Sequence, residues 1–73
     1  MASLPVVSGD DVVRALERAG FSRAGQRGSH LKMRDASGRT AIVPMHREIA
    51  LGTLRSLLRQ AGLTPEGFVS LLE

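Results

Sequence analysis

The stretch Ser-His-Leu-Lys-Met-Arg, residues 29–34, decides how this chain folds, because its side chains alternate between polar and apolar. A β-strand points successive side chains to opposite faces of its sheet. The alternation therefore predicts a strand that buries Leu31 and Met33 against a core. The opposite face of the same strand carries His30, Lys32 and Arg34. We expect that face to stay open to a ligand.

Two further strands are predicted on either side of this one. Residues 21–27 suggest an irregular first strand, weakened by Gly25. Residues 35–38, Asp-Ala-Ser-Gly, have the composition of a turn. Residues 39–43 are rich in β-branched side chains and are closed by Pro44. The middle of the chain is thus predicted to be an antiparallel meander.

Helical signals flank the predicted sheet on both sides. Before it, a capping-box pattern at Ser8 and Asp11 predicts a helix over residues 9–19. After it, apolar residues recur at helical spacing over residues 51–61, and Pro65 is placed to begin a short third helix. The element order is therefore α-β-β-β-α with a short C-terminal helix.

This order predicts an α+β fold in which a three-stranded antiparallel sheet carries the helices on one face. At 73 residues the chain has room for one domain, so residues 1–73 are expected to fold as a unit. It contains no cysteine, which excludes disulfides and thiolate-bound zinc. The apolar runs are short and the first residues lack a secretory pattern, so we expect a cytosolic protein without membrane contact.

Positive charge is concentrated in the middle of the chain. The formal net charge is +3, but residues 20–60 hold eight basic residues against two acidic ones. Nine of the ten basic residues are arginine, whose planar guanidinium suits bidentate contact with phosphate. This distribution favours a polyanionic partner such as nucleic acid.

The leading candidate for chemistry is His30, because histidine both takes and gives a proton near neutral pH. RNA offers its own nucleophile, the 2′-hydroxyl, so a base and nearby cations are sufficient in principle. The basic middle offers only Asp35 and Glu48 as carboxylates, and the two histidines lack zinc-ligand spacing. We therefore expect neither a metal nor another cofactor.

Candidate contacts to RNA surround this histidine in the sequence. Gly28 and Ser29 precede it and allow close approach of the backbone to a phosphate, although a strand entry or bulge explains them equally well. The candidate phosphate-binding side chains are Arg27, Lys32, Arg34, Arg39, His46 and Arg47. Any one of these is also explained as ordinary solvated surface. The second proton-transfer group is left open among His46, Lys32 and water.

Three runs of residues together resemble the HicA toxin family. They are Gly-Ser-His at 28–30, Val-Pro-Met-His at 43–46 and Leu-Gly-Thr-Leu-Arg-Ser-Leu-Leu-Arg-Gln-Ala-Gly-Leu at 51–63. The similarity extends to Ala-Gly-Phe at 19–21 and Thr-Pro-Glu-Gly-Phe at 64–68, so it spans nearly the whole chain. The resemblance implies a fold like the double-stranded-RNA-binding domain, mRNA cleavage that arrests translation, and a cognate HicB antitoxin that masks the site.

In this resemblance the catalytic histidine corresponds to His30. Many members carry a second histidine directly after the first, where this chain has Leu31. Because Leu31 is predicted to face the core, the departure should leave the catalytic group in place. It does leave the route of proton transfer open.

The sequence also bears on functions other than RNA cleavage. A DNA-binding helix-turn-helix over residues 53–61 and 65–72 is disfavoured, because its second helix lacks Arg, Lys, Asn and Gln to pair with base edges. We expect no DNA contact by this chain alone. A single-strand reader needs surface aromatics, whereas Phe21 and Phe68 are expected in the core. A non-catalytic module that binds double-stranded RNA, or one that binds only an antitoxin, stays open.

Overall fold

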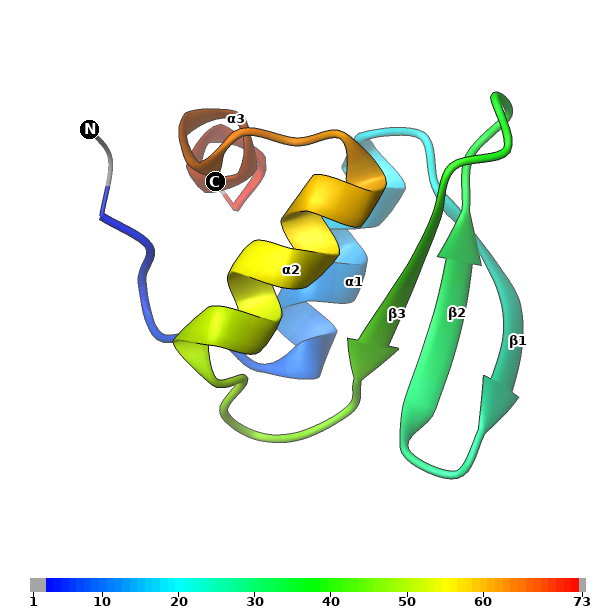
Figure 1. Cartoon of the computed structure of the whole chain (residues 1–73), viewed down its shortest axis with the longest axis horizontal. Coiled ribbons are helices and arrows are strands. Elements are labelled where there is room, and N and C mark those ends of the chain that lie inside the picture. The colour runs from blue at the N-terminus through cyan, green and yellow to red at the C-terminus, as the bar shows by residue number, and fades with distance from the viewer. Residues whose placement is uncertain (1–2, 73) are drawn as a thin grey trace.

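The computed structural model describes residues 3–72, and its elements follow one another in the predicted order (Figure 1). The helices and strands are α1 (Gly9–Arg18), β1 (Ser22–Arg27), β2 (His30–Arg34), β3 (Thr40–Pro44), α2 (Leu51–Ala61) and α3 (Pro65–Leu71). The strands form one antiparallel sheet in the order β1-β2-β3. The predicted α+β fold with a short C-terminal helix is confirmed.

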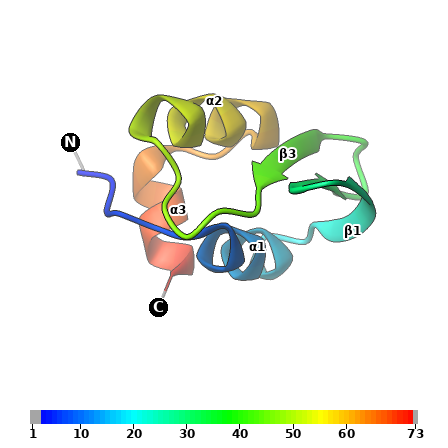
Figure 2. The same cartoon turned by 90° about the horizontal axis from the view of Figure 1, so that it is seen from below.

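The helices gather on one side of the sheet, and both α1 and α2 contact β3 (Figures 1 and 2). Strand β2 alternates as predicted: Leu31 and Met33 are buried, whereas the residues between and beside them are exposed. Their core partners include Leu16 of α1, Leu58 of α2 and Phe68 of α3, which is fully buried. Within residues 3–72 no helix has the length and apolar character that a membrane span requires.

The turn between β1 and β2 includes Ser29, which the sequence had predicted to lie in the second strand. Ser29 was expected inside the strand, but β2 begins at His30. Arg27 pairs directly with His30, so Gly28 and Ser29 form a two-residue hairpin loop. Gly28 has a φ of +56°, which matches a type II′ turn with glycine at the first central position. A residue with a side chain at position 28 would strain this turn.

Strand β1 is irregular, as Gly25 in the sequence predicted. The register with β2 shifts between Arg23 and Gly25, which marks a bulge. All six residues of β1 are exposed. The buried residue on this side of the molecule is Phe21, just before the strand, with 4% of its surface exposed. Strand β1 therefore contributes little to the core and much to the surface.

Side-chain caps fix where the helices begin. The Ser8 hydroxyl accepts a hydrogen bond from the N–H of Asp11 at 3.1 Å, and the Asp11 carboxylate accepts one from the N–H of Ser8 at 3.0 Å. The predicted capping box is thus confirmed. Hydrogen bonds from the backbone and the hydroxyl of Ser8 outweigh desolvation and lower the pKa of Asp11 below 3.8, with help from Arg14. In α3, the Thr64 hydroxyl accepts from the N–H of Gly67 at 3.0 Å.

Gly9 sets how closely α1 approaches the loop after β3. Its N–H donates to the carbonyl of His46 at 2.9 Å. A Cβ atom at position 9 would lie 2.6 Å from the carbonyl oxygen of Pro44 and 2.8 Å from the Cα of Met45. Those distances are too short for any side chain, so α1 and this loop meet only because residue 9 is glycine.

Gly9→Ala is expected to destabilise the protein by about 1–3 kcal/mol, because the added methyl group must push the loop away from α1. Gly52→Ala is the matched control, since this glycine also lies in the first turn of a helix and a Cβ there meets open space. It should stabilise by about 0.5–1 kcal/mol. Thermal denaturation followed by circular dichroism measures both. Equal effects of the two substitutions would disprove the close packing at Gly9.

Candidate active site

His30 occupies the first position of β2, directly after the hairpin turn, and its side chain is exposed on the open face of the sheet. Its neighbour across β3 is Pro44 and its neighbour across β1 is Arg27. The ring thus lies where the sheet face meets the loop that follows β3. A ligand on the sheet face and a ligand in that loop region would both reach it.

His46 lies beside His30. The sequence alone had not indicated whether the two histidines are neighbours. The two ring centroids are 6.5 Å apart and the ring planes are inclined at 67°, an edge-to-face arrangement. Both side chains are exposed. Two exposed imidazoles at this separation can contact one ligand group from two directions.

Three backbone hydrogen bonds hold His46 in this place. Pro44 has no N–H, and the next amide, that of Met45, donates to the carbonyl of Ser29 at 2.6 Å, which ties the loop to the β1–β2 turn. The N–H of His46 donates to the carbonyl of Pro44 at 2.9 Å, and its carbonyl accepts from Gly9. The loop is therefore fixed to the hairpin on one side and to α1 on the other.

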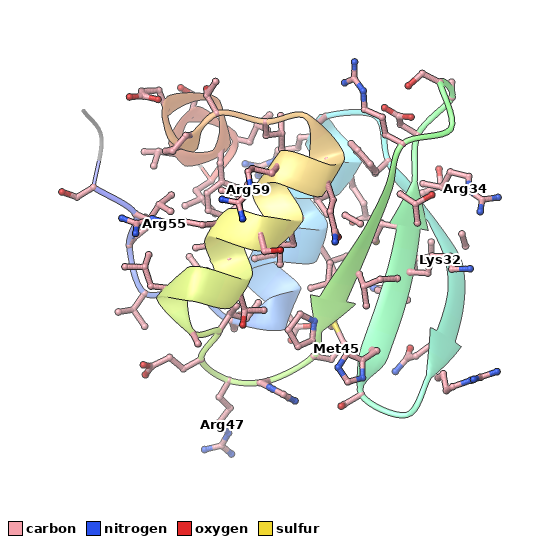
Figure 3. All side chains as sticks on the ribbon, in the orientation of Figure 1. Lys32, Arg34, Met45, Arg47, Arg55 and Arg59 are labelled. Atoms are coloured by element: carbon pink, nitrogen blue, oxygen red, sulfur yellow. The ribbon has the colours of Figure 1, made fainter. Side chains whose placement is uncertain are left out.

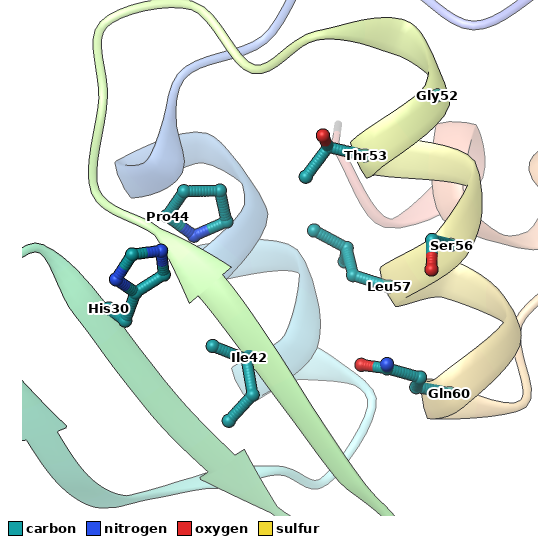
Figure 4. A pocket seen from close by; sticks show the side chains of 8 residues that line it. All are labelled: His30, Ile42, Pro44, Gly52, Thr53, Ser56, Leu57 and Gln60. Atoms are coloured by element: carbon teal, nitrogen blue, oxygen red, sulfur yellow. The ribbon is translucent and has the colours of Figure 1, made fainter.

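Two depressions meet at the His30 ring. The first lies over the sheet face and measures about 440 Å³; we call it the sheet hollow, and it is lined by Gly25, Gln26, Arg27, His30, Lys32 and Ile42. The second lies between the sheet and α2 and measures about 380 Å³ (Figure 4). We call it the α2 cleft, and it is lined by His30, Ile42, Pro44, Gly52, Thr53, Ser56, Leu57 and Gln60. His30 and Ile42 form the boundary between them.

The predicted phosphate contacts divide by position, and those nearest His30 are Arg27 and Lys32. Both line the sheet hollow, Arg27 as the cross-strand neighbour of His30 and Lys32 two positions along the same face. Arg34 lies at the far end of that face, where its Nε donates to the Thr40 hydroxyl at 3.3 Å. Figure 3 shows Lys32 and Arg34 on the side of the sheet away from the helices. Gly28 and Ser29 form the turn between Arg27 and His30.

Arg39 and Arg47 lie elsewhere. The guanidinium of Arg39 packs over Gly62 at the end of α2, where a Cβ atom would meet its nitrogen at 2.9 Å. Arg47 projects from the loop after β3 away from the sheet (Figure 3) and lines a separate hollow with Ser8, Asp10, Met45 and His46. The fold does not bring these two arginines to Lys32.

Asp35 organises the turn between β2 and β3. Its Oδ1 accepts hydrogen bonds from the Ser37 hydroxyl at 2.8 Å, the Ser37 N–H at 3.0 Å and the Arg39 N–H at 2.9 Å. Desolvation raises the pKa of Asp35, but these bonds and the charge of Arg39 outweigh it, so the pKa lies below 3.8. This carboxylate is committed to the turn. Elsewhere among residues 3–72, no three histidine, aspartate or glutamate side chains cluster as metal ligands would.

Sequence reasoning missed the far wall of the α2 cleft. Thr53, Ser56 and Gln60 recur three and four positions apart, so they lie on one face of α2, and Figure 4 shows Thr53 and Gln60 extending toward the sheet. Their helical spacing was visible in the sequence beside the leucine stripe. Gly9 was missed as well, because its role depends on contacts with Pro44 and Met45, which lie far along the chain.

The protein thus combines a small α+β fold with two neighbouring histidines and a sheet face that carries basic residues. The family model of the HicA toxin of bacterial toxin-antitoxin systems matches residues 9–63, well over half of the chain. The chain belongs to the HicA toxin family, which confirms the resemblance. The matched span runs from α1 through α2 and contains both histidines. No curated protein matches the chain in sequence.

The edge-to-face contact between His30 and His46 is testable in solution. His46→Ala should shift the ring-proton resonances of His30, and His30→Ala should shift those of His46, because each ring lies within the ring-current field of the other. Two-dimensional NMR of the histidine rings measures this. Arg55→Ala is the control, since Arg55 lies on α2 away from the sheet face (Figure 3). Unchanged ring-proton shifts in both histidine variants would contradict the arrangement.

Proposed function

We propose that this chain is the toxin of a type II toxin–antitoxin pair and a metal-independent endoribonuclease that cleaves mRNA and arrests translation. The observation that carries the proposal is the pair of imidazoles, His30 and His46, whose ring centroids are 6.5 Å apart, with Arg27 and Lys32 lining the sheet hollow next to His30. Membership of the HicA toxin family supports the toxin role. Because mRNA is the substrate, the site of action is the cytoplasm.

The proposed reaction uses the 2′-hydroxyl of RNA as nucleophile. His30 takes the 2′-hydroxyl proton as general base while the 2′-oxygen attacks the adjacent phosphorus. The P–O5′ bond breaks, and protonated His46 gives its proton to the leaving 5′-oxygen. The products are a 2′,3′-cyclic phosphate and a 5′-hydroxyl. Attacking and leaving oxygens lie roughly in line across the phosphorus, so two proton-transfer groups on opposite sides of one phosphate suit this geometry.

Charge in the transition state falls on the non-bridging phosphate oxygens. Arg27 and Lys32 line the sheet hollow next to His30 and supply positive charge at that position. The nucleophile belongs to the substrate, and the cations belong to the protein. The reaction so described needs no metal ion.

The family also implies a partner, a HicB-type antitoxin. We propose that the antitoxin covers the face of the toxin that bears His30 and Lys32, because both side chains are exposed and an RNA strand must reach them. Occupation of that face by the antitoxin would prevent cleavage without any change in the toxin's fold.

His30→Ala and His46→Ala are each expected to lower the rate of RNA cleavage by about 100-fold or more, which is the lower range for loss of one acid–base group. Both side chains are exposed, so the circular dichroism spectrum should not change. Cleavage by the parent protein should give a bell-shaped pH profile and should persist in EDTA.

Each readout excludes a different alternative. Undiminished cleavage by His30→Ala would remove this residue from the mechanism, and loss of cleavage in EDTA would make the reaction metal-dependent. A parent protein that binds duplex RNA and never cleaves it would be the non-catalytic module instead.

Lys32→Ala is expected to weaken binding of non-cleavable RNA and to reduce the slope of log affinity against log salt by about 1, as loss of one phosphate contact requires. Arg55→Ala is the matched control, because Arg55 lies on α2 away from the sheet face (Figure 3). It removes the same charge from the protein. Equal loss of affinity and slope in the two variants would show that net charge alone governs binding.

A further inference from the structure

We infer that the α2 cleft binds one unpaired nucleobase of the RNA, next to the phosphate held at His30, and that Gln60 contacts the edge of that base. This inference rests on the proposed function and adds to it a determinant of substrate choice. It comes from the contrast between the two depressions that meet at the His30 ring.

The two depressions differ in charge. The sheet hollow carries Arg27 and Lys32. In the part of the chain that the structure describes, the α2 cleft is lined by no arginine, lysine, aspartate or glutamate. A phosphate bound there would have no arginine or lysine among its lining contacts. The α2 cleft therefore suits an uncharged part of the nucleotide, while the sheet hollow suits the backbone.

The lining of the α2 cleft matches the chemistry of a base. Ile42 is 38% exposed and supplies the accessible apolar surface on which the flat face of a base can lie, while Pro44 and Leu57 are buried and form the apolar floor beneath it. Thr53, Ser56 and Gln60 supply neutral hydrogen-bonding groups from one face of α2 (Figure 4). A nucleobase has the same division, with apolar faces and a polar edge.

Gln60 is suited to distinguish one base from another. Its amide presents one acceptor and two donors, so it can pair with a base edge that offers a donor beside an acceptor. It extends from the last turn of α2 toward Ile42, across the cleft from the sheet (Figure 4). The cleft volume of about 380 Å³ lies at the small end of the range for ligand pockets, about 300–1,000 Å³. One base fits this space better than a run of bases.

A paired base cannot enter this cleft, because its edge and both faces are already occupied in the duplex. The inference therefore predicts single-stranded substrate at the cleaved position. This separates the proposal from recognition of double-stranded RNA by shape, which would use the sheet face alone.

The test measures binding rather than cleavage, with short single-stranded RNA oligonucleotides that carry 2′-O-methyl sugars and so cannot be cut. One position at a time is made abasic or is varied among the four bases. For the parent protein, loss of the base at one position should weaken binding about 5- to 150-fold, the range that stacking and hydrogen bonds to one base supply. Annealing a complementary strand should abolish that contribution.

Variants assign the effect to the cleft. Gln60→Leu keeps the size of the side chain and should reduce the difference among the four bases to within about twofold, and Ser56→Ala should weaken binding at the same position. Ser70→Ala is the matched control on α3, outside the cleft, and should behave as the parent. The inference is overturned if no abasic position matters, or if Gln60→Leu discriminates among bases as the parent does. This experiment measures binding alone, and the cleavage assay above measures catalysis. Base binding in a protein that does not cleave RNA would refute the proposed nuclease function and leave the inference standing. Cleavage by a protein that shows no base binding would refute only the inference.

Discussion

The hydrogen bond from the amide of Met45 to the carbonyl of Ser29 is the constraint on which the site depends. It is the first backbone bond past Pro44, a residue that cannot donate one, and it holds the loop after β3 against the tip of the first hairpin. His30 and His46 are the side chains that immediately follow its two ends. The contact of α1 through Gly9 then holds the same loop from behind. A pair of groups far apart in sequence is thereby held as one unit.

Much of the fold was predictable because local rules and the global fold agree. The alternation of β2 placed Leu31 and Met33 in the core, where they are 2% and 0% exposed. Leu31 therefore faces away from the open face that carries His30. The capping box and the three helices followed from residues close together in the chain. The errors were limited to boundaries, such as Ser29, where a turn and a strand start compete for the same residues.

The candidate site was only half predictable. The position of His30 followed from β2 alone, but the position of His46 depends on bonds to Ser29 and Gly9, which no local pattern encodes. Arg39 was named as a candidate phosphate contact from its residue type alone, and only the structure shows that its backbone is bound by Asp35 and its side chain lies over Gly62. The α2 cleft needed the relative placement of α2 and β3. Residue type and spacing supply candidates, and long-range packing selects among them.

The irregular strand β1 bears on how the molecule behaves in concentrated solution. Strand β1 pairs with β2 on one side, and in residues 3–72 its other side pairs with no strand. A free strand edge invites intermolecular sheet growth and aggregation. The bulge beside Gly25 twists that edge, and Arg23 and Arg27 place like charges on any two copies that approach. The same cations that favour a polyanion therefore help to keep the free toxin from self-association.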